Sequence, residues 1–243
     1  MEASRPIFLF TDFGWSGPYV GQMIGAVQSI CASCPVTSLM HDAPAMRPDL
    51  AAYLLAACCG GLPRGSIVVA VVDPGVGGER AALIVETPDL TFVGPDNGLL
   101  SRLPRITHVR RIDWRPPVMS SSFHGRDLFA PVAAYLACDK GVATTPLASR
   151  TMVGSEWQED TGRIVFVDAY GNLMTGLRAA KISEKCTLHV ADRGIPRAET
   201  FCHVAPGGLF WYCNSQGLLE IAANGTSAAK MMSLALGDEI LID

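Results

Sequence analysis

The sequence lacks three features that would place a protein in a class at once. No stretch of the 243-residue sequence approaches the ~18 consecutive apolar residues of a membrane-spanning helix. The longest candidate, "LAAYLLAACCGGLPRG", is broken by glycines and a proline. The start, "MEASRPIFLF", lacks the basic end, long apolar core and cleavage site of a signal peptide. The net charge of −4 offers no basic excess for nucleic acid. We therefore expect a cytoplasmic protein that acts on a small molecule and binds neither a membrane nor nucleic acid.

The eight cysteines do not form a complete metal or disulfide pattern. Without an export signal, an even number of cysteines does not indicate disulfides. "CASC", residues 31–34, has the spacing of a metal or redox motif, yet no second Cys or His pair follows it. We expect these thiols to be buried as small hydrophobic groups, with a zinc or redox role as the less favoured alternative.

Two common phosphate-binding motifs are also missing. The glycine-rich stretch "VVDPGVGGER", residues 71–80, contains no lysine, and the "AALIVE" that follows predicts a strand rather than a helix. Three glycines in one loop allow positive-φ backbone and close approach of other atoms, at an entropic cost that a purely structural turn rarely needs. The loop between Asp73 and Arg80 therefore indicates a functional site rather than a purely structural turn.

The composition, 49% hydrophobic and 17% charged, is that of a globular protein. In residues 1–150, short apolar runs such as "SIVVAVV" alternate with helical patterns such as "YVGQMIGAVQSIC", which predicts an α/β domain with a largely parallel sheet. Residues 155–243 contain short β-like runs separated by Gly, Asn and Asp, which predict a small antiparallel β-barrel domain. We interpret "GVATTPLASRTMVGSE" as the linker between the two domains.

Polar residues follow the predicted strands of the first domain, at the sheet edge where α/β proteins bind ligands. They are Asp12 in "TDFG", Asp73 in "DPGVGGER", Asp96 and Asn97 in "GPDNG", and His124, Arg126 and Asp127 in "SFHGRD". Considered alone, Asp96 is best explained as a helix-capping or turn residue. Arg126 and Asp127, considered alone, are best explained as an ion pair near a helix N-terminus. Four clusters at one edge, however, indicate a site.

A metal-hydrolase site built from Asp73, His124 and Asp127 is an alternative use of these residues. Only one histidine is close by and the sequence has no H-x-x-H or H-x-x-x-H pair, so we favour chemistry without a metal. In the second domain, "VDAYGN" and "NSQGLLEIAANG" carry polar residues that singly predict hairpin turns. As a group they could surround a polar small molecule.

Taken in order, "TDFG", "DPGVG", "PDNG", "FHGRD", "YGN" and "NSQGLLEIAANG" resemble the S-adenosylmethionine (SAM) hydroxide adenosyltransferase family. This family is the hydrolase branch of a group that includes the SAM-dependent fluorinase and chlorinase. The resemblance runs from about residue 6 to the C-terminus. It implies hydrolysis of SAM to adenosine and L-methionine without a cofactor. It also implies a homotrimer that binds SAM between the first domain of one subunit and the second domain of the next.

The resemblance also assigns individual residues. The water-activating group would be Asp73, Arg80 and His124. The substrate-binding residues would be Asp12 at the ribose hydroxyls, Gly125, Asp168 at the methionine ammonium, Asn172 at the adenine edge, Phe201 stacked on adenine, Ser215 at the methionine carboxylate, and the backbone from Ala223 to Gly225 at adenine.

Simple chemistry is consistent with these roles. Methionine leaves the sulfonium as a neutral thioether and needs no proton, so a good nucleophile is what the reaction lacks. A carboxylate, a guanidinium and an imidazole around one water can align it with the C5′–S bond. Arg80 favours the ionised form of Asp73, which would repel a halide. Water is therefore the expected nucleophile, and a halogenase or a SAM sensor without turnover are the alternatives.

Overall fold

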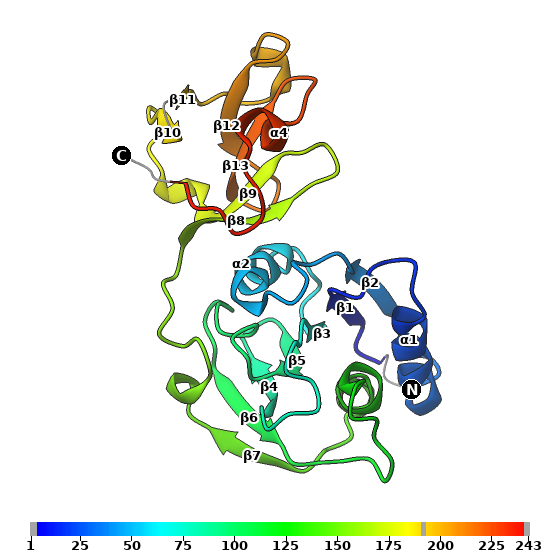
Figure 1. The fold of residues 1–243 in the computed structure, drawn as a ribbon. Helices are drawn as coiled ribbons and strands as arrows, with labels where there is room; N and C mark the ends of the chain where they lie inside the picture. Colours follow the sequence, from blue (N-terminus) through cyan, green and yellow to red (C-terminus); the bar gives the residue numbers. More distant parts are fainter. Residues whose placement is uncertain (1–3, 191–192, 241–243) are drawn as a thin grey trace. The chain divides into compact units, whose positions relative to one another are not determined.

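The computed structural model describes residues 4–190 and 193–240 and contains two compact units, Met1–Trp157 and Gln158–Asp243 (Figure 1). Each unit is described by itself. Among the described residues, no helix combines the length and apolar character needed to cross a bilayer.

The first unit is built on a seven-stranded sheet with the order β2-β1-β3-β5-β4-β6-β7. Its strands are β1 (Ile7–Thr11), β2 (Val36–Met40), β3 (Ile67–Val71), β4 (Ala82–Glu86), β5 (Thr91–Pro95), β6 (His108–Ile112) and β7 (Thr144–Leu147). The pairs β1–β2, β1–β3 and β3–β5 are parallel, and the three remaining pairs are antiparallel. The predicted parallel sheet is therefore confirmed for one half, while a tight turn between Thr87 and Leu90 makes β4 and β5 antiparallel.

The predicted linker is wrong at one point. Residues 144–147, within "GVATTPLASRTMVGSE", form β7 and pair with β6 at the edge of the sheet. Pro146 is compatible with this strand because an edge position tolerates a missing N–H donor.

The helices of the first unit, among the residues described, are α1 (Tyr19–Ile30), α2 (Pro48–Cys58), the π-helix η1 (Gly125–Phe129) and α3 (Ala130–Ala137), with a short 3-10 turn η2 (Ser149–Thr151). Helix α1 packs against α3 and η1. Their apolar side chains share a core with those of β1 and β3, including the fully buried Met23, Phe129 and Ile67. This core holds α1, η1 and α3 in place.

Cys31 and Cys34 form a disulfide, so the expectation that these two residues are thiols is wrong, whereas their expected burial is confirmed. The backbone turns directly after α1, where the amide of Cys34 donates to the carbonyl of Cys31, and this turn brings the two Cα atoms within 5.4 Å. That distance lies within the normal range for a disulfide. The other six cysteines are free.

The second unit contains a four-stranded antiparallel sheet with the order β12-β13-β9-β8 and a separate pair, β10-β11. Its strands are β8 (Thr161–Val167), β9 (Leu173–Arg178), β10 (Leu188–Val190), β11 (Arg193–Ile195), β12 (Leu209–Cys213) and β13 (Leu218–Ala223). Short turns η3 (Ala179–Lys181) and η4 (Phe201–His203) and helix α4 (Ala228–Met232) connect or cover them. The antiparallel character is confirmed. In the part of the chain that the structure describes, the strand pairings do not close a barrel.

Candidate active site

The ends of two neighbouring strands bring together the first pair of acids. Strands β1 and β3 are parallel, with Thr11 opposite Val71, so Asp12 and Asp73 leave the sheet at the same edge. Both line a cavity of about 360 Å³, together with His124 and Gly125. Of the four predicted clusters, those of Asp12, Asp73 and His124 thus contribute to one cavity, whereas Asp96 and Asn97 are not among its lining residues.

The loop from Asp73 to Arg80 folds back on itself. Hydrogen bonds from Val76 N to Asp73 O and from Gly78 N to Gly75 O reverse the chain. As a result, Nε of Arg80 lies 3.1 and 3.0 Å from the two carboxylate oxygens of Asp73, and Nη2 lies 2.5 Å from Oδ2. Only 11% of the Arg80 side chain and 4% of the Asp73 side chain are exposed. These are charge-assisted bonds at a largely dry position, which are the strong kind.

Gly77 explains the glycine content of this loop. Its φ of +81° is one that other residues rarely adopt, and a Cβ at this position would overlap the backbone oxygen of Ser121. Ser121 lies three residues before His124. Gly77 therefore allows the loop that carries Asp73 and Arg80 to lie directly against the segment that carries His124.

Arg80 also fixes the protonation of His124. Its Nη2 lies 2.8 Å from Nδ1 of the imidazole. A guanidinium has only donors, so Nδ1 must accept, and the single ring proton is on Nε2. Burial, and then the positive charge of Arg80, lower the pKa of His124 below its ordinary value. The imidazole therefore stays neutral, with Nε2–H as its free donor.

His124 directly precedes η1, a turn of π-helix of the kind often found at functional sites. At Gly125, a Cβ would lie 3.2 Å from the ring of Phe123 and 3.3 Å from the sulfur of Met23. A larger residue would push these neighbours apart, so the close packing around Gly125 supports the position of His124.

Three aromatic side chains that the sequence analysis did not single out line the same cavity: Phe13, Tyr19 and Phe123. Their ring centroids lie 5.4–5.7 Å apart in tilted and edge-to-face pairs. Phe13 and Phe123 lie within "TDFG" and "SFHGRD", two motifs that were selected for their polar residues. Tyr19 is the first residue of α1. They give the cavity an apolar part beside its charged groups.

Asp12 is held by the amide of Met46, which donates to Oδ2 at 3.0 Å. Burial raises the pKa of Asp12, and the negative charge of Asp73 adds to that effect. Thr11 next to it bonds the buried His41 at 2.8 Å, and His41 in turn contacts Ser38. This network anchors the turn that carries Asp12.

The other polar residues at this edge have structural partners. Asp96 accepts from the amide of Val153, Asn97 donates to the carbonyl of Val72, and Arg126 pairs with Asp127 at 2.6 Å. Asp127 does not join Asp73 and His124 in a group of potential metal ligands. Among the described residues, the three-membered group whose ligand atoms lie within 4.8 Å of one another consists of cysteines: Cys31, Cys34 and Cys138.

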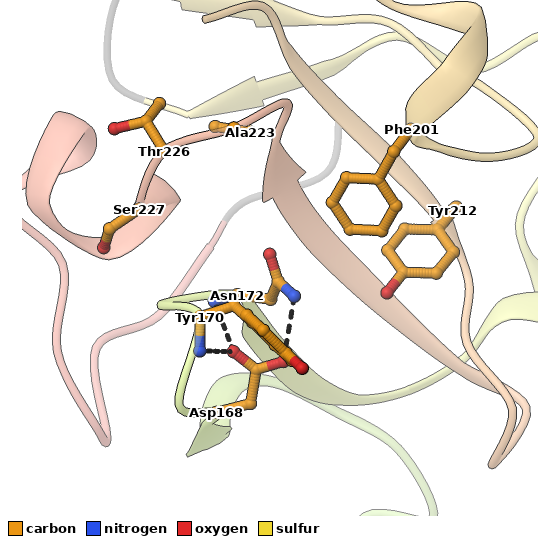
Figure 2. A pocket seen from close by; sticks show the side chains of 9 residues that line it. Asp168, Tyr170, Asn172, Phe201, Tyr212, Ala223, Thr226 and Ser227 are labelled. Carbon is orange, nitrogen blue, oxygen red and sulfur yellow. Dashed lines mark hydrogen bonds between the residues drawn. The ribbon is translucent and has the colours of Figure 1, made fainter.

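The second unit has a cavity of its own, of about 610 Å³ (Figure 2). Five of the predicted substrate-binding residues line it: Asp168, Asn172, Phe201, Ala223 and Gly225. Tyr170, Tyr212, Thr226 and Ser227, which the sequence analysis did not select, line it as well. The exposed Ser215 is not among the lining residues and bonds Gln216, so its contact with substrate stays a prediction.

Asp168 and Asn172 form one unit in this cavity. The carboxylate of Asp168 accepts from the amides of Tyr170 and Asn172 and from Nδ2 of Asn172, at 2.8–2.9 Å (Figure 2). These bonds hold the side chain of Asn172, which is 4% exposed. Its Oδ1 is buried without a hydrogen-bond partner among the described residues. An acceptor left in this way is costly unless a ligand donates to it.

A buried acid supports the aromatic side of this cavity. Glu220 accepts from the Tyr212 hydroxyl at 2.5 Å and from Nδ2 of Asn214 at 2.8 Å. Burial raises the pKa of Glu220 and also that of Tyr212. Phe201 packs edge-on against Tyr212, with centroids 5.8 Å apart. The two rings thus form an ordered aromatic surface.

Both halves of the chain match the models of one family. Residues 7–145 match the SAM hydroxide adenosyltransferase N-terminal domain, and residues 162–241 match the C-terminal domain. The chain belongs to the SAM hydroxide adenosyltransferase family. The resemblance inferred from the short motifs is thereby confirmed.

Relatives of known name in this family align over nearly their whole length. The (R)-S-adenosyl-L-methionine hydrolase of Salinispora arenicola is 34% identical, with 99% of this chain and 98% of the relative covered. The enzyme of the same name from Thermus thermophilus is 33% identical, with 96% and 97% covered. The one from Methanocaldococcus jannaschii is 30% identical, with 97% and 95% covered.

Solved structures of similar proteins share the fold of this family member. A crystal structure of an uncharacterized conserved protein from Thermotoga maritima has a TM-score of 0.87 at 28% identity, with 96% of this chain and 98% of that chain covered. A conserved hypothetical protein from Thermus thermophilus has a TM-score of 0.79 at 33% identity, with 98% and 100% covered.

Proposed function

We propose that this chain hydrolyses (R)-S-adenosyl-L-methionine to adenosine and L-methionine by attack of water at C5′. The observation that carries the proposal is Arg80, which bonds both Asp73 and His124 at the wall of a cavity that also contains Asp12. The names of the relatives, which cover nearly the full chain, support the same substrate.

The protonation of His124 assigns the steps. Water has a pKa of about 15.7, so it attacks carbon well only when a base takes its proton. With Nδ1 occupied by Arg80 and a proton on Nε2, the imidazole has no lone pair to offer. Asp73 is therefore the proton acceptor, and the Nε2–H of His124 orients the water oxygen. As the O–C5′ bond forms, the C5′–S bond breaks, and its electron pair leaves with the neutral methionine sulfur.

The two cavities divide recognition of the substrate. In the first unit, the carboxylate of Asp12 suits the two ribose hydroxyls, since one carboxylate accepts both bonds. In the second unit, Oδ1 of Asn172 accepts from the adenine amino group, and Phe201 supplies a ring for stacking. Asp168 and Ser215 take the ammonium and carboxylate of the methionine part, as the family resemblance implies.

We place the complete site between copies of the chain. In a cytoplasmic homotrimer, the first unit of one copy and the second unit of the next would enclose one SAM molecule, with no cofactor. Light scattering should give the mass of three chains. Mixing inactive Asp73→Ala protein with impaired Asn172→Ala protein, after dissociation and reassembly, should give more activity than the two proteins kept apart, because some mixed sites combine two intact halves. A monomer, or no recovery, would contradict a shared site.

The direct test of function is chromatography of SAM incubated with the purified protein. We expect adenosine and methionine, and ¹⁸O from labelled water in the adenosine 5′-hydroxyl. Intact SAM together with thermal stabilisation by SAM would indicate a sensor instead. Formation of 5′-chloro-5′-deoxyadenosine at high chloride would indicate a halogenase.

A further inference from the structure

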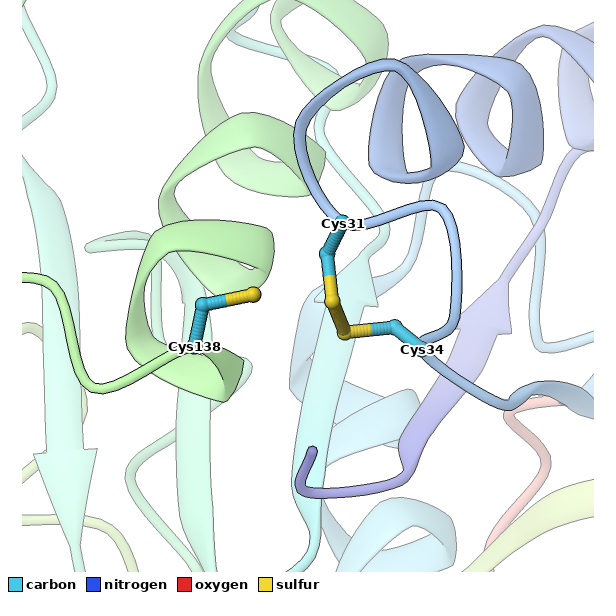
Figure 3. Close-up of side chains that lie close together, drawn as sticks. All are labelled: Cys31, Cys34 and Cys138. Carbon is cyan, nitrogen blue, oxygen red and sulfur yellow. A yellow bond between two sulfur atoms is a disulfide. The ribbon is translucent and has the colours of Figure 1, made fainter. Parts of the chain in front are cut away.

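A third cysteine faces the disulfide of the first unit. Cys138 stands at the end of α3, far along the chain from Cys31 and Cys34, and its sulfur points toward theirs (Figure 3). All three sulfur atoms lie within 4.8 Å of one another. "CASC" lacks a partner pair in the sequence, and the fold supplies one further thiol.

The surroundings allow thiol chemistry at this point. Cys31 and Cys34 are 4% and 5% exposed within the apolar core, where a neutral disulfide is easily accommodated. Cys138 is half-buried at the rim of the same core, so solvent and small reagents reach its side of the group. The remaining free cysteines, such as Cys58 and Cys202, are not members of this group.

We propose that Cys31, Cys34 and Cys138 form a thiol–disulfide exchange site. The thiolate of Cys138 attacks one sulfur of the Cys31–Cys34 disulfide, a new S–S bond forms to Cys138, and the other cysteine leaves as a thiolate that takes up a proton. One disulfide and one thiol are present before and after the exchange, so the step needs no oxidant. A dithiol reductant, which supplies two electrons and two protons, converts the site to three thiols.

Exchange changes what the disulfide connects. The Cys31–Cys34 bond joins residues three positions apart and constrains one turn. A bond to Cys138 joins the end of α1 to the end of α3. The opposite ends of these segments carry Tyr19, at the start of α1, and His124, just before η1. The exchanged form therefore cross-links α1 to the η1–α3 segment, whose first residues lie at the cavity of the first unit. This consequence does not depend on which reaction takes place in that cavity.

Alkylation of the unreduced wild-type chain tests the exchange. With N-ethylmaleimide at limiting amount, followed by peptide mass spectrometry, exchange distributes one label among Cys138, Cys31 and Cys34. Each labelled form has a disulfide between the other two. Label on Cys138 alone, with the Cys31–Cys34 disulfide intact in every molecule, would overturn the proposal. Exposed Cys202 serves as the reference thiol, labelled in either case.

Single variants test the geometry separately. After incubation with oxidised glutathione, Cys34→Ser should form a Cys31–Cys138 disulfide and Cys31→Ser a Cys34–Cys138 disulfide. The oxidised Cys34→Ser protein should melt at a higher temperature than its reduced form, because the new bond closes a long loop. The matched Cys34→Ser/Cys138→Ser control should show no such rise in melting temperature. Absence of the Cys31–Cys138 bond in the oxidised single variant, with glutathione left on the more accessible Cys138, would contradict the exchange.

Discussion

Nη2 of Arg80 lies 2.8 Å from Nδ1 of His124 and 2.5 Å from Oδ2 of Asp73. One terminal nitrogen of the guanidinium thus donates hydrogen bonds to both an imidazole and a carboxylate. Phe129 lies below this group, with its ring centroid 5.2 Å from the central guanidinium carbon. Because Arg80 is itself a fixed donor, the position of the proton on His124 follows from this contact.

Asp73→Asn should remove the proton acceptor while keeping the shape of the loop. General-base catalysis contributes about 10²–10⁴-fold in rate, so we expect kcat to fall by at least about 100-fold. Adenosine affinity, measured by calorimetry, should change little, since adenosine does not need the base. A variant with near-normal kcat would show that another group accepts the proton.

Two substitutions of His124 separate its two nitrogens. Asn places an acceptor near the position of Nδ1 and so retains the bond from Arg80, but it lacks the distal donor. We expect His124→Asn to melt near the wild-type temperature yet lose about 100-fold in kcat, the usual effect of one oriented donor. His124→Gln, whose longer amide can place an N–H near the position of Nε2, should retain more rate. The reverse order would contradict a donor role for Nε2.

The pH profile of kcat tests the neutral imidazole. Burial and the charge of Arg80 lower the pKa of His124, so protonation of the folded enzyme begins only below its ordinary value of 6.5. The unfolded chain takes up that proton earlier as the pH falls, so stability from His124 is full above pH 6.5 and is lost as the pH drops through the lowered pKa. The rate should be constant from pH 8 to 6.5. A histidine-dependent loss of rate centred above pH 6.5, absent in His124→Gln, would contradict this assignment.

Gly77→Ala tests the contact between the two catalytic loops. The substitution places a Cβ at φ +81° against the backbone of Ser121. Gly65 has the same φ of +81° but nothing within 4 Å, so Gly65→Ala is the matched control. Both variants should lose about 1–2 kcal/mol of stability from the left-handed backbone, measured by urea unfolding, and Gly77→Ala should lose more because its Cβ overlaps the backbone of Ser121. Only Gly77→Ala should lose activity as well, and equal activities would show that the contact does not position the catalytic groups.

Asn172→Ala tests the unpartnered acceptor of the second cavity. Wild-type protein should bind adenosine more tightly than inosine, which carries an oxygen where adenosine has its amino group. The loss of one bond to a buried acceptor corresponds to about 1–3 kcal/mol. We expect Asn172→Ala to bind the two nucleosides with similar affinity in calorimetry. Undiminished preference for adenosine would place the adenine amino group elsewhere.

The site could be predicted where its chemistry follows from strand order. Asp12 and Asp73 each come after an apolar run, and parallel strands end at one edge, so their convergence required no coordinates. The pairing of Arg80 with Asp73 followed from one short loop. The proton position on His124 did not follow, because it depends on which ring nitrogen meets Arg80 after folding.

Other features depended on tertiary contacts with no local signal. Residues 144–147 were included in the predicted linker, and only their pairing with β6 at the edge of the sheet identifies them as a strand. The cysteine group was hidden because Cys138 joins Cys31 and Cys34 only after α1 and α3 pack together. Apart from Phe201, which was predicted, the aromatic residues that line the two cavities were overlooked, because aromatic residues also fit an ordinary core.

The wide turn after His124 sets a limit on how this protein can change over evolutionary time. An α-helix advances about 100° per residue, whereas η1 accommodates an extra residue before α3 begins. Loss of any one position between Gly125 and Phe129 would restore a regular helix and rotate His124 away from Arg80, whichever amino acid was lost. A change in the length of that segment is thus expected to disturb the site even where every remaining side chain is kept.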